Sequence, residues 1–222
     1  FLRQKRFIDD GYIPITTVQD FEKIVSGDTS HVFAVNTAFE GTYNPTVESK
    51  YILLNDIDFS QAGPYDSYII EESAIITIEG NNQKISNITV NYSARNDVYA
   101  GTGIFGSIND SRIENLKFEN ITINGGPNAN GALAGYSRGG NYFENLVFEN
   151  VNVTGDTYVG GLIGTNDARI PKFENIEGVY LSGNIHGQGI VGGLYAQFNT
   201  LNRDARVNDV SVNATMTGTS IV

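Results

Sequence analysis

The apolar residues of this chain recur in short alternating runs that are interrupted by Asn and end near Gly. At residues 113–123, apolar side chains are separated by one or two polar ones, and the same arrangement returns 30 residues later, beginning at Phe143. This spacing is close to the period of two that is typical of a β-strand, and it differs from the 3.6-residue period of a helix. The pattern therefore predicts strands, one set after another.

Two short motifs repeat in phase along these runs. The first is Gly161-Leu162-Ile163-Gly164, with variants that begin at residues 103, 132 and 193. The second joins an apolar residue, a polar residue and Asn, as in Ile113-Glu114-Asn115-Leu116, with other copies that begin at residues 85, 143 and 173 and a last copy at 207 that has Asp209 in place of Asn. Two motifs that share one period of about thirty residues indicate a repeat architecture with one copy per coil.

The composition of the repeat decides which architecture is expected. Its segments are rich in Ile, Val, Phe, Thr and Asn, whereas helical repeats would need Ala, Leu, Glu and Lys. We therefore predict an all-β fold, a right-handed parallel β-helix (β-solenoid), with coils stacked about 4.8 Å apart. Equivalent residues of successive coils should then lie above one another.

Stacked coils predict columns of like residues. The apolar column would contain Ile85, Ile113, Phe143, Phe173 and Val207. A polar ladder, with hydrogen bonds between stacked side chains, would contain Asn87, Asn115, Asn145, Asn175 and Asp209. The repeat glycines, which would allow tight turns or close approach of the backbone, are Gly103, Gly106, Gly135, Gly161, Gly164 and Gly193.

Residues 45–222 resemble the GLUG repeat region of prokaryotic secreted and cell-surface proteins. The resemblance rests on the Gly-Leu-Ile-Gly core, on the Phe-Glu-Asn-Ile and Ile-Glu-Asn-Leu segments, and on the lead-in at residues 51–58 and 78–85. Ala132 and Ala196 depart from the four-residue core. Such regions occur in large adhesins and before the catalytic part of IgA-cleaving metallopeptidases, so the resemblance implies an extracellular or cell-surface location.

Composition narrows the classes of partner and chemistry. The chain has 222 residues and a formal net charge of −11, which argues against nucleic acid because phosphate binding needs a basic face. It has no cysteine, which excludes disulfides and thiol chemistry. The chain contains no run of 18 apolar residues, so its sequence predicts no membrane-spanning helix. We expect one domain over residues 1–222, with an N-terminal arm and cap at 1–50 and coils at 51–222.

Both ends of the chain carry specific expectations. Residues 16–25 predict a short helix that begins with a capping box of Thr17 and Asp20. This helix would cover the first coil. Residues 1–8 are expected to form a solvated tail, a first edge strand or an arm that pairs with a neighbouring molecule, and 31–35 a strand. Ile221-Val222 repeats the position that opens a coil at 158–159 and 190–191. We expect the solenoid to continue beyond Val222 or to be completed by another molecule.

Few residues suggest chemistry. Asp56 and Asp58 share a strand face and could hold calcium or act as paired acids, although bonding to the backbone is the more ordinary role. Glu114, Glu144 and Glu174 should form an outward column that Lys117 and Lys172, or cations, would offset. The two histidines, His31 and His186, are far apart in sequence. We therefore expect no catalytic residues, no resident metal and no cofactor, with calcium as the one candidate.

Asn-x-Ser/Thr triplets and tyrosines suggest surface roles. Candidate glycosylation sites are Asn91, Asn109, Asn120, Asn152 and Asn213, whereas Asn87 should stay unmodified in the ladder. Tyrosines outside the core, namely Tyr12, Tyr43, Tyr65, Tyr68 and Tyr92, could stack on sugar rings or be ordinary surface residues.

The leading functional hypothesis is a non-catalytic structural or adhesive module of a secreted or cell-surface protein. The alternatives are a self-assembling filament subunit joined head to tail, an accessory region of a secreted peptidase, and a polysaccharide-acting enzyme. The expected partners are further coils, other copies of the chain, carbohydrate or a host surface.

Overall fold

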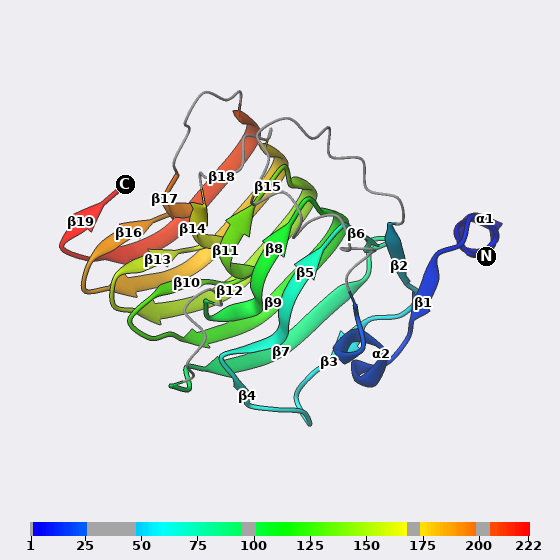
Figure 1. Cartoon of the computed structure of the whole chain (residues 1–222), viewed down its shortest axis with the longest axis horizontal. Helices are drawn as coiled ribbons and strands as arrows, with labels where there is room; N and C mark the ends of the chain where they lie inside the picture. The colour runs from blue at the N-terminus through cyan, green and yellow to red at the C-terminus, as the bar shows by residue number, and fades with distance from the viewer. Residues whose placement is uncertain (1, 26–47, 95–100, 168–173, 199–204) are drawn as a thin grey trace, which may run out of the picture.

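A computed structural model of the chain describes residues 2–25, 48–94, 101–167, 174–198 and 205–222. Its strands form three sheets in which every strand pair is parallel, so the predicted β-solenoid is confirmed. The coils stack from β2 and β6 at one end to β18 at the other, and the two termini lie at opposite ends of the stack (Figure 1). No helix in the described ranges is long and apolar enough to span a bilayer.

The largest sheet has ten strands and forms one broad side of the solenoid. Its main path runs through β1 (Ile13–Ile15), β2 (Ser49–Leu53), β6 (Ile76–Glu79), β9 (Arg112–Asn124), β12 (Tyr142–Gly155), β15 (Glu174–Gly187) and β18 (Ala205–Thr217). Off this path, β3 (Ile57–Asp58) and β4 (Tyr65–Asp66) pair with β7 (Lys84–Asn91), which pairs with β9.

Two smaller sheets complete each coil. The five-stranded sheet contains β5 (Tyr68–Ala74), β8 (Gly103–Asn109), β11 (Ala134–Arg138), β14 (Ile163–Asp167) and β17 (Tyr195–Gln197). The four-stranded sheet contains β10 (Ala129–Gly131), β13 (Tyr158–Gly160), β16 (Ile190–Gly192) and β19 (Ser220–Ile221). Two helices precede the coils, α1 (Leu2–Asp9) and α2 (Val18–Glu22).

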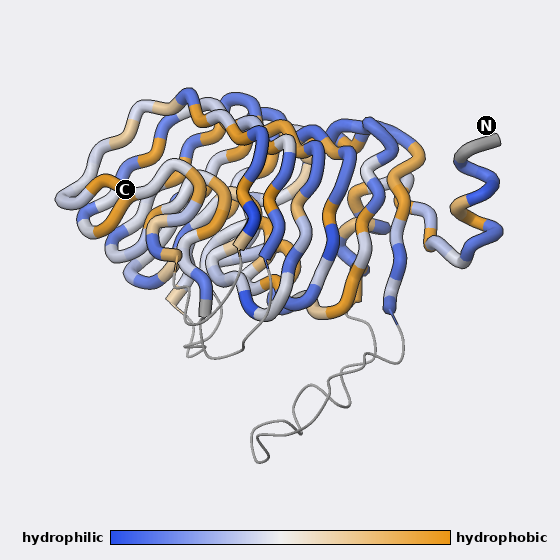
Figure 2. The backbone as a smooth tube through the Cα atoms, turned by 90° about the horizontal axis from the view of Figure 1, so that it is seen from above, coloured by the Kyte–Doolittle hydropathy of each residue, from blue (hydrophilic) through white to orange (hydrophobic). Residues whose placement is uncertain are grey.

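Residues about thirty apart in sequence are neighbours in space, as the repeat predicts. Phe143 pairs with Ile113 on one side and with Ile176 on the other. Their side chains are buried, and apolar positions recur at the same level of successive coils (Figure 2). The rings of Phe118 and Phe148 stack with their centroids 4.5 Å apart. Like-on-like packing thus fills the interior.

The large sheet contains two Asn ladders, where the sequence predicted one. In the first, Asn145 donates from Nδ2 to Oδ1 of Asn115 at 3.1 Å, and Asn115 donates to the buried carboxylate of Glu79 at 3.1 Å. Asn115 and Asn145 both have a left-handed backbone, with φ of 55° and 51°. Because Asn tolerates this conformation better than most residues, it can bend the strand and still bond to the next coil.

The amides of the second ladder also donate toward the N-terminal coils, and this ladder also ends on a carboxylate. Asn150 donates to Asn120 at 2.8 Å, Asn120 to Asn87 at 3.0 Å, and Asn87 to the carboxylate of Asp58 at 2.8 Å. Ser60 also donates to this carboxylate, from its backbone and its hydroxyl. These hydrogen bonds lower the pKa of Asp58, and the bond from Asn87 contributes most to this shift. In both ladders every amide donates toward the N-terminal end, and the row finishes on an acceptor that carries charge when ionised.

Three residues, Ile85, Asn87 and Asn175, lie at other levels of the solenoid than the predicted columns placed them. Asn87 lies in the second ladder, because Ile85 pairs with Phe118 and not with Ile113. Asn175 is buried outside both ladders, since Ile176 pairs with Phe143 and Gly178 occupies the position beside Asn145. The cause is that each coil holds two similar segments, for example Ile113-Glu114-Asn115-Leu116 and Phe118-Glu119-Asn120-Ile121.

The last member of the predicted ladder lies in the expected column but bonds differently. Asp209 has a φ of 49° and follows Asn208, which pairs with Glu177. Its carboxylate accepts a hydrogen bond from the hydroxyl of Tyr180 at 2.7 Å. Phe173, which was expected in the apolar column, lies outside the described residues.

The repeat glycines lie where neighbouring backbones approach closely. A Cβ on Gly161 would lie 2.1 Å from the carbonyl oxygen of Gly193, and one on Gly164 would lie 2.5 Å from the backbone nitrogen of Asn130. Gly103 and Gly135 are similarly enclosed by backbone. Gly106 lies in β8 at the matching motif position. Gly193 differs, because the atoms nearest to a Cβ there would belong to the side chain of Val212, at 3.0 Å.

The predicted capping helix is present as α2. Thr17 and Asp20 form the expected capping box, in which the side chain of each residue accepts a hydrogen bond from the backbone N–H of the other. Phe21 is buried against the rings of Phe59 and Phe105. This helix therefore covers the apolar interior at the N-terminal end.

The first residues form a structure that the sequence analysis did not propose. Residues 2–9 form the helix α1, so the predicted edge strand is wrong, whereas the solvated tail and the arm toward a neighbouring molecule stay predictions. The strand role belongs instead to β1, which pairs in parallel with β2. The strand predicted at 31–35 falls outside the described residues.

Replacing Asn145 tests the ladder and the backbone conformation separately. Asn145→Gly keeps the left-handed backbone and loses the bond to Asn115, which should cost about 1 kcal/mol. Asn145→Ala should cost about 1 kcal/mol more, because Ala disfavours positive φ. Urea unfolding of both variants measures the difference, and an Ala variant as stable as the Gly variant would contradict this account.

The lowered pKa of Asp58 predicts a pH dependence of stability. A carboxyl whose folded-state pKa is depressed stabilises the fold fully above its unfolded pKa of about 4 and loses that contribution as pH falls through the folded value. Asp58→Asn should therefore flatten the decline in the unfolding free energy below pH 4. Asp20, whose pKa is lowered to about 2 by its bonds to Thr16 and Thr17, contributes to this decline in both proteins. Asp66→Asn, at an exposed position of β4, is the matched control for the unfolding series.

Candidate functional site

The outward face of the ten-stranded sheet carries the candidate surface. Along β9 and β12 the side chains alternate between buried apolar residues and solvent-facing polar ones. The second Asn ladder divides this face into two bands. We call the first the charged band, which comprises Lys84, Arg112, Glu114, Lys117, Glu119, Tyr142, Glu144 and Glu149. We call the second the amide–hydroxyl band, which comprises Thr89, Asn91, Thr122, Asn124, Asn152, Thr154, Asn184, His186, Thr215 and Thr217.

The charged band pairs its acids with cations across coils. Arg112 donates to Glu114 of its own strand at 2.8 Å and to Glu144 of the next coil at 3.1 Å. Its guanidinium also lies 5.1 Å from the ring centroid of Tyr142. The repulsion expected between stacked Glu114 and Glu144 is thus offset by one arginine, a residue the sequence analysis did not single out.

A second set of ion pairs joins three coils. Lys84 binds Glu119 at 2.8 Å, and Lys117 binds Glu149 at 2.7 Å and Glu119 at 3.5 Å. The hydrogen bond from Lys84 is the main reason that the pKa of Glu119 is lowered, and the same bond raises the pKa of Lys84. Lys117 was expected to offset the column of Glu114, Glu144 and Glu174, but its partners are Glu119 and Glu149. Lys172 lies outside the described residues.

Glu174 does not belong to the outward column, which continues instead through Glu177. Glu174 is buried, and its Oε1 accepts hydrogen bonds from Ser137 and Tyr195, each at 2.6 Å. Burial is the main cause, and the charge of Glu174 the second, that raises the pKa of Tyr195 well above its usual value. This polar cluster ties three coils together inside the solenoid.

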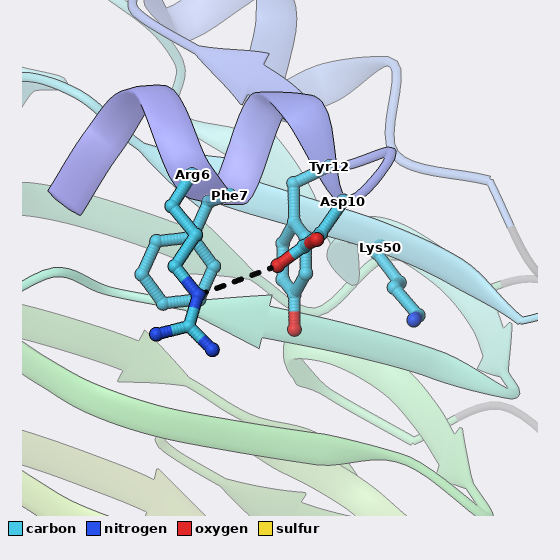
Figure 3. A pocket seen from close by; sticks show the side chains of 5 residues that line it. All are labelled: Arg6, Phe7, Asp10, Tyr12 and Lys50. Carbon is cyan, nitrogen blue, oxygen red and sulfur yellow. Dashed lines mark ion pairs between the residues drawn. The ribbon is translucent and has the colours of Figure 1, made fainter. Parts of the chain in front are cut away.

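An open pocket lies between α1 and the first strands (Figure 3). It is lined by Arg6, Phe7, Asp10, Tyr12 and Lys50. Phe7 meets Tyr12 edge to face at 4.9 Å, and Lys50 lies 5.6 Å from the Tyr12 ring centroid. Burial, and then the charge of Glu114, raises the pKa of Tyr12. The pocket thus brings an aromatic pair next to charged groups that sequence spacing did not connect.

The two candidate metal ligands hold other bonds. Asp56 accepts from the backbone nitrogen of Lys84 at 2.8 Å, and Asp58 is the end of the second ladder. Within the described parts of the chain, no three His, Cys, Asp or Glu residues come together as a metal site. His186 lies on β15, and His31 is outside the described residues. Calcium binding remains an expectation from sequence.

The candidate glycosylation sites differ in their surroundings. Asn109 is buried and donates from Nδ2 to Glu72, and Asn120 donates from Nδ2 within the second ladder. Modification at either Nδ2 would break these bonds. Asn91 and Asn152 are acceptors for Asn124 and Asn184, and Asn213 is exposed on β18. Their modification stays a prediction.

The amide–hydroxyl band is a feature that the sequence analysis did not assemble. Its signal is a triplet such as Thr122-Ile123-Asn124, in which two outward polar residues flank a buried apolar one. Corresponding triplets lie in register at 89–91, 152–154, 184–186 and 215–217. Amide pairs bridge the coils, from Asn124 to Asn91 at 2.7 Å and from Asn184 to Asn152 at 2.9 Å.

Comparison with known proteins supports the fold. No protein family and no curated protein matches the sequence. Among solved structures, the chain is similar to one described as a "putative immunoglobulin A1 protease from Bacteroides ovatus". The TM-score is 0.57 and the identity 17%, over 93% of this chain and 67% of that one. At this identity the likeness shows that the two chains share a β-solenoid fold.

Proposed function

We propose that this chain is a non-catalytic structural and adhesive β-solenoid module of a secreted or cell-surface protein. The observation that carries the proposal is the continuous set of bonds between coils: two Asn ladders that finish on Glu79 and Asp58, and ion pairs that join successive strands. Side chains that bond from coil to coil stiffen a stack in which each repeat contacts only its neighbours. A rigid stack suits a spacer or a display surface.

The charged band supports this non-catalytic role. Glycoside hydrolases use two carboxyl groups, one of which must stay protonated through a raised pKa. Here Glu119 has a lowered pKa, and Glu114 and Glu144 share the guanidinium of Arg112. These ion pairs give the acids a structural use, so a polysaccharide-acting enzyme ranks below the scaffold.

The secreted setting rests on resemblance. The GLUG-like motifs are typical of secreted and surface proteins, and the structural neighbour is described as a "putative immunoglobulin A1 protease". An accessory region of a secreted peptidase is therefore one context in which such a module would serve, positioning a catalytic part elsewhere.

A self-assembling subunit is a second candidate function, favoured by the surface of the last described coil. There Val207, Ile221 and Val222 expose 55%, 54% and 69% of their surface. The row Val210, Val212, Ala214 and Met216 of β18 packs against the core and is only partly buried. Strands β1 and β18 are the two ends of the main path of the ten-stranded sheet. Parallel pairing of β1 of one copy with β18 of another would continue the sheet, and repetition of that contact would give a filament.

The extracellular scaffold is tested on the cells that produce the protein. Antibodies against the purified chain should label intact cells or the culture medium, and protease added outside should remove the cell-bound signal. A cytosolic protein should be labelled only after lysis and serves as the control. Labelling of this chain that also requires lysis would overturn the proposed location.

Head-to-tail assembly is tested by sedimentation velocity over a wide range of concentration. The purified chain should form larger species as concentration rises, and Val207→Lys should shift it toward monomer because the charge would be buried in the contact. Tyr142→Ser, on the lateral face, should assemble as the parent chain does. A parent chain that stays monomeric throughout would refute assembly.

A further inference from the structure

We propose that the amide–hydroxyl band is a binding surface for a neutral polysaccharide that runs along the solenoid axis. This inference rests on the proposed adhesive function and assigns it a site and a class of ligand. The band occupies the second half of each long strand, and residues 88–94, 120–131, 150–155, 182–192 and 210–222 contain no Asp, Glu, Lys or Arg. Charged side chains of the same strands lie on the other side of the ladder.

The band has a regular geometry. Its triplets place two outward polar residues about 6.6 Å apart along each strand, and the strands lie about 4.8 Å apart. Thr122 pairs with Asn152, and Asn152 with Asn184, so a row of hydroxyl and amide groups crosses successive coils. A second row passes through Asn124, Thr154 and His186 in the same way. A polymer with repeating hydroxyl groups presents matching donors and acceptors.

The amides are held in place before any ligand arrives. Asn124 is bonded to Asn91, and Asn184 to Asn152, which limits the rotamers that binding would otherwise have to order. An amide has two N–H donors and a carbonyl oxygen with two lone pairs, so one such bond leaves capacity for a ligand. The hydroxyl of Thr154 bonds weakly to the carbonyl of Ile123 at 3.3 Å and still offers lone pairs.

An aromatic ring marks one edge of the band. Tyr92 follows Asn91 directly, and its backbone nitrogen donates to the carbonyl of Asn124 at 2.7 Å. A Cβ on Gly126 would lie 2.3 Å from the Tyr92 ring, so the missing side chain of this glycine makes room for the ring. Tyr92 remains 39% exposed. Its electron-rich face can receive the C–H groups of a sugar ring.

Charge selects a neutral ligand over an acidic one. The chain has a net charge of −11, which repels anionic polymers. A neutral glycan brings no charge to desolvate, and the residues of the band are uncharged, with the exposed Asp66 beside Asn91 as the charge at its first coil. Hydrogen bonds and stacking can therefore give net affinity. Such binding should depend little on ionic strength.

The proposal is tested with the purified 222-residue chain by affinity electrophoresis in gels that contain mannan, β-glucan or galactan. At least one of these polymers should retard the chain, and added salt should not release it. Tyr92→Ala should weaken retardation about two- to tenfold, whereas Tyr92→Phe should retain it. Thr122→Glu should weaken it too, by placing a charge in the band. Circular dichroism confirms that each variant is folded.

Tyr142→Ala is the matched control, because it removes an exposed tyrosine from the charged band. It should bind as the parent chain does. The proposal is overturned if no neutral polymer retards the chain, if Tyr142→Ala loses as much binding as Tyr92→Ala, or if polygalacturonate alone binds and salt abolishes that binding. Since the assay uses purified protein, its failure is distinct from a failure to find the chain outside the cell.

Discussion

The structure depends on parallel, in-register stacking of strands from successive coils. The backbone of each coil forms its hydrogen bonds with the coils above and below. The side chain at any position therefore lies next to the side chains at the equivalent positions of the neighbouring coils. The interior then requires apolar residues of compatible size at each level, as in the column of Ile113, Phe143 and Ile176. The same constraint gives polar residues a partner in the next coil.

The left-handed bends in the long strands show how this constraint acts on sequence. A bend must recur at the same level in each coil, or the strands lose register. Asn115, Asn145, Gly178 and Asp209 occupy one such level, all with positive φ. Gly178 provides the bend without a side chain and so interrupts the ladder, whereas Asn provides both the bend and the bond between coils.

Stacking also organises the surface. Residues of like chemistry form rows along the axis, and the second ladder separates the paired charges of one band from the uncharged amides and hydroxyls of the other. Ion pairs of the exposed kind contribute little to stability, so the charged band chiefly prevents repulsion between stacked acids. The uncharged band has no such requirement, and its regular composition is the basis of the proposed binding surface.

The sequence alone determined the fold class, the period and the N-terminal cap. Alternating apolar residues, in-phase motifs and the Thr17–Asp20 capping box each reflect local or nearest-neighbour physics, and each is confirmed. The bond between Asn115 and Asn145 also followed, because these residues are 30 positions apart in coils of equal length. The candidate site was harder to predict from sequence. Its rows combine Thr, Asn and His, which are all polar but are different residue types, so no repeated letter marks them.

Only the tertiary structure decided which of two similar segments aligns with which. Asn87 is 33 residues from its partner Asn120, and Asn175 lies three positions before the true equivalent of Asn145. The lengths of the connections between strands set these offsets, and no local pattern encodes them. The burial of Glu174 beneath Ser137 and Tyr195 likewise depends on three separate coils meeting, which spacing within one coil cannot reveal.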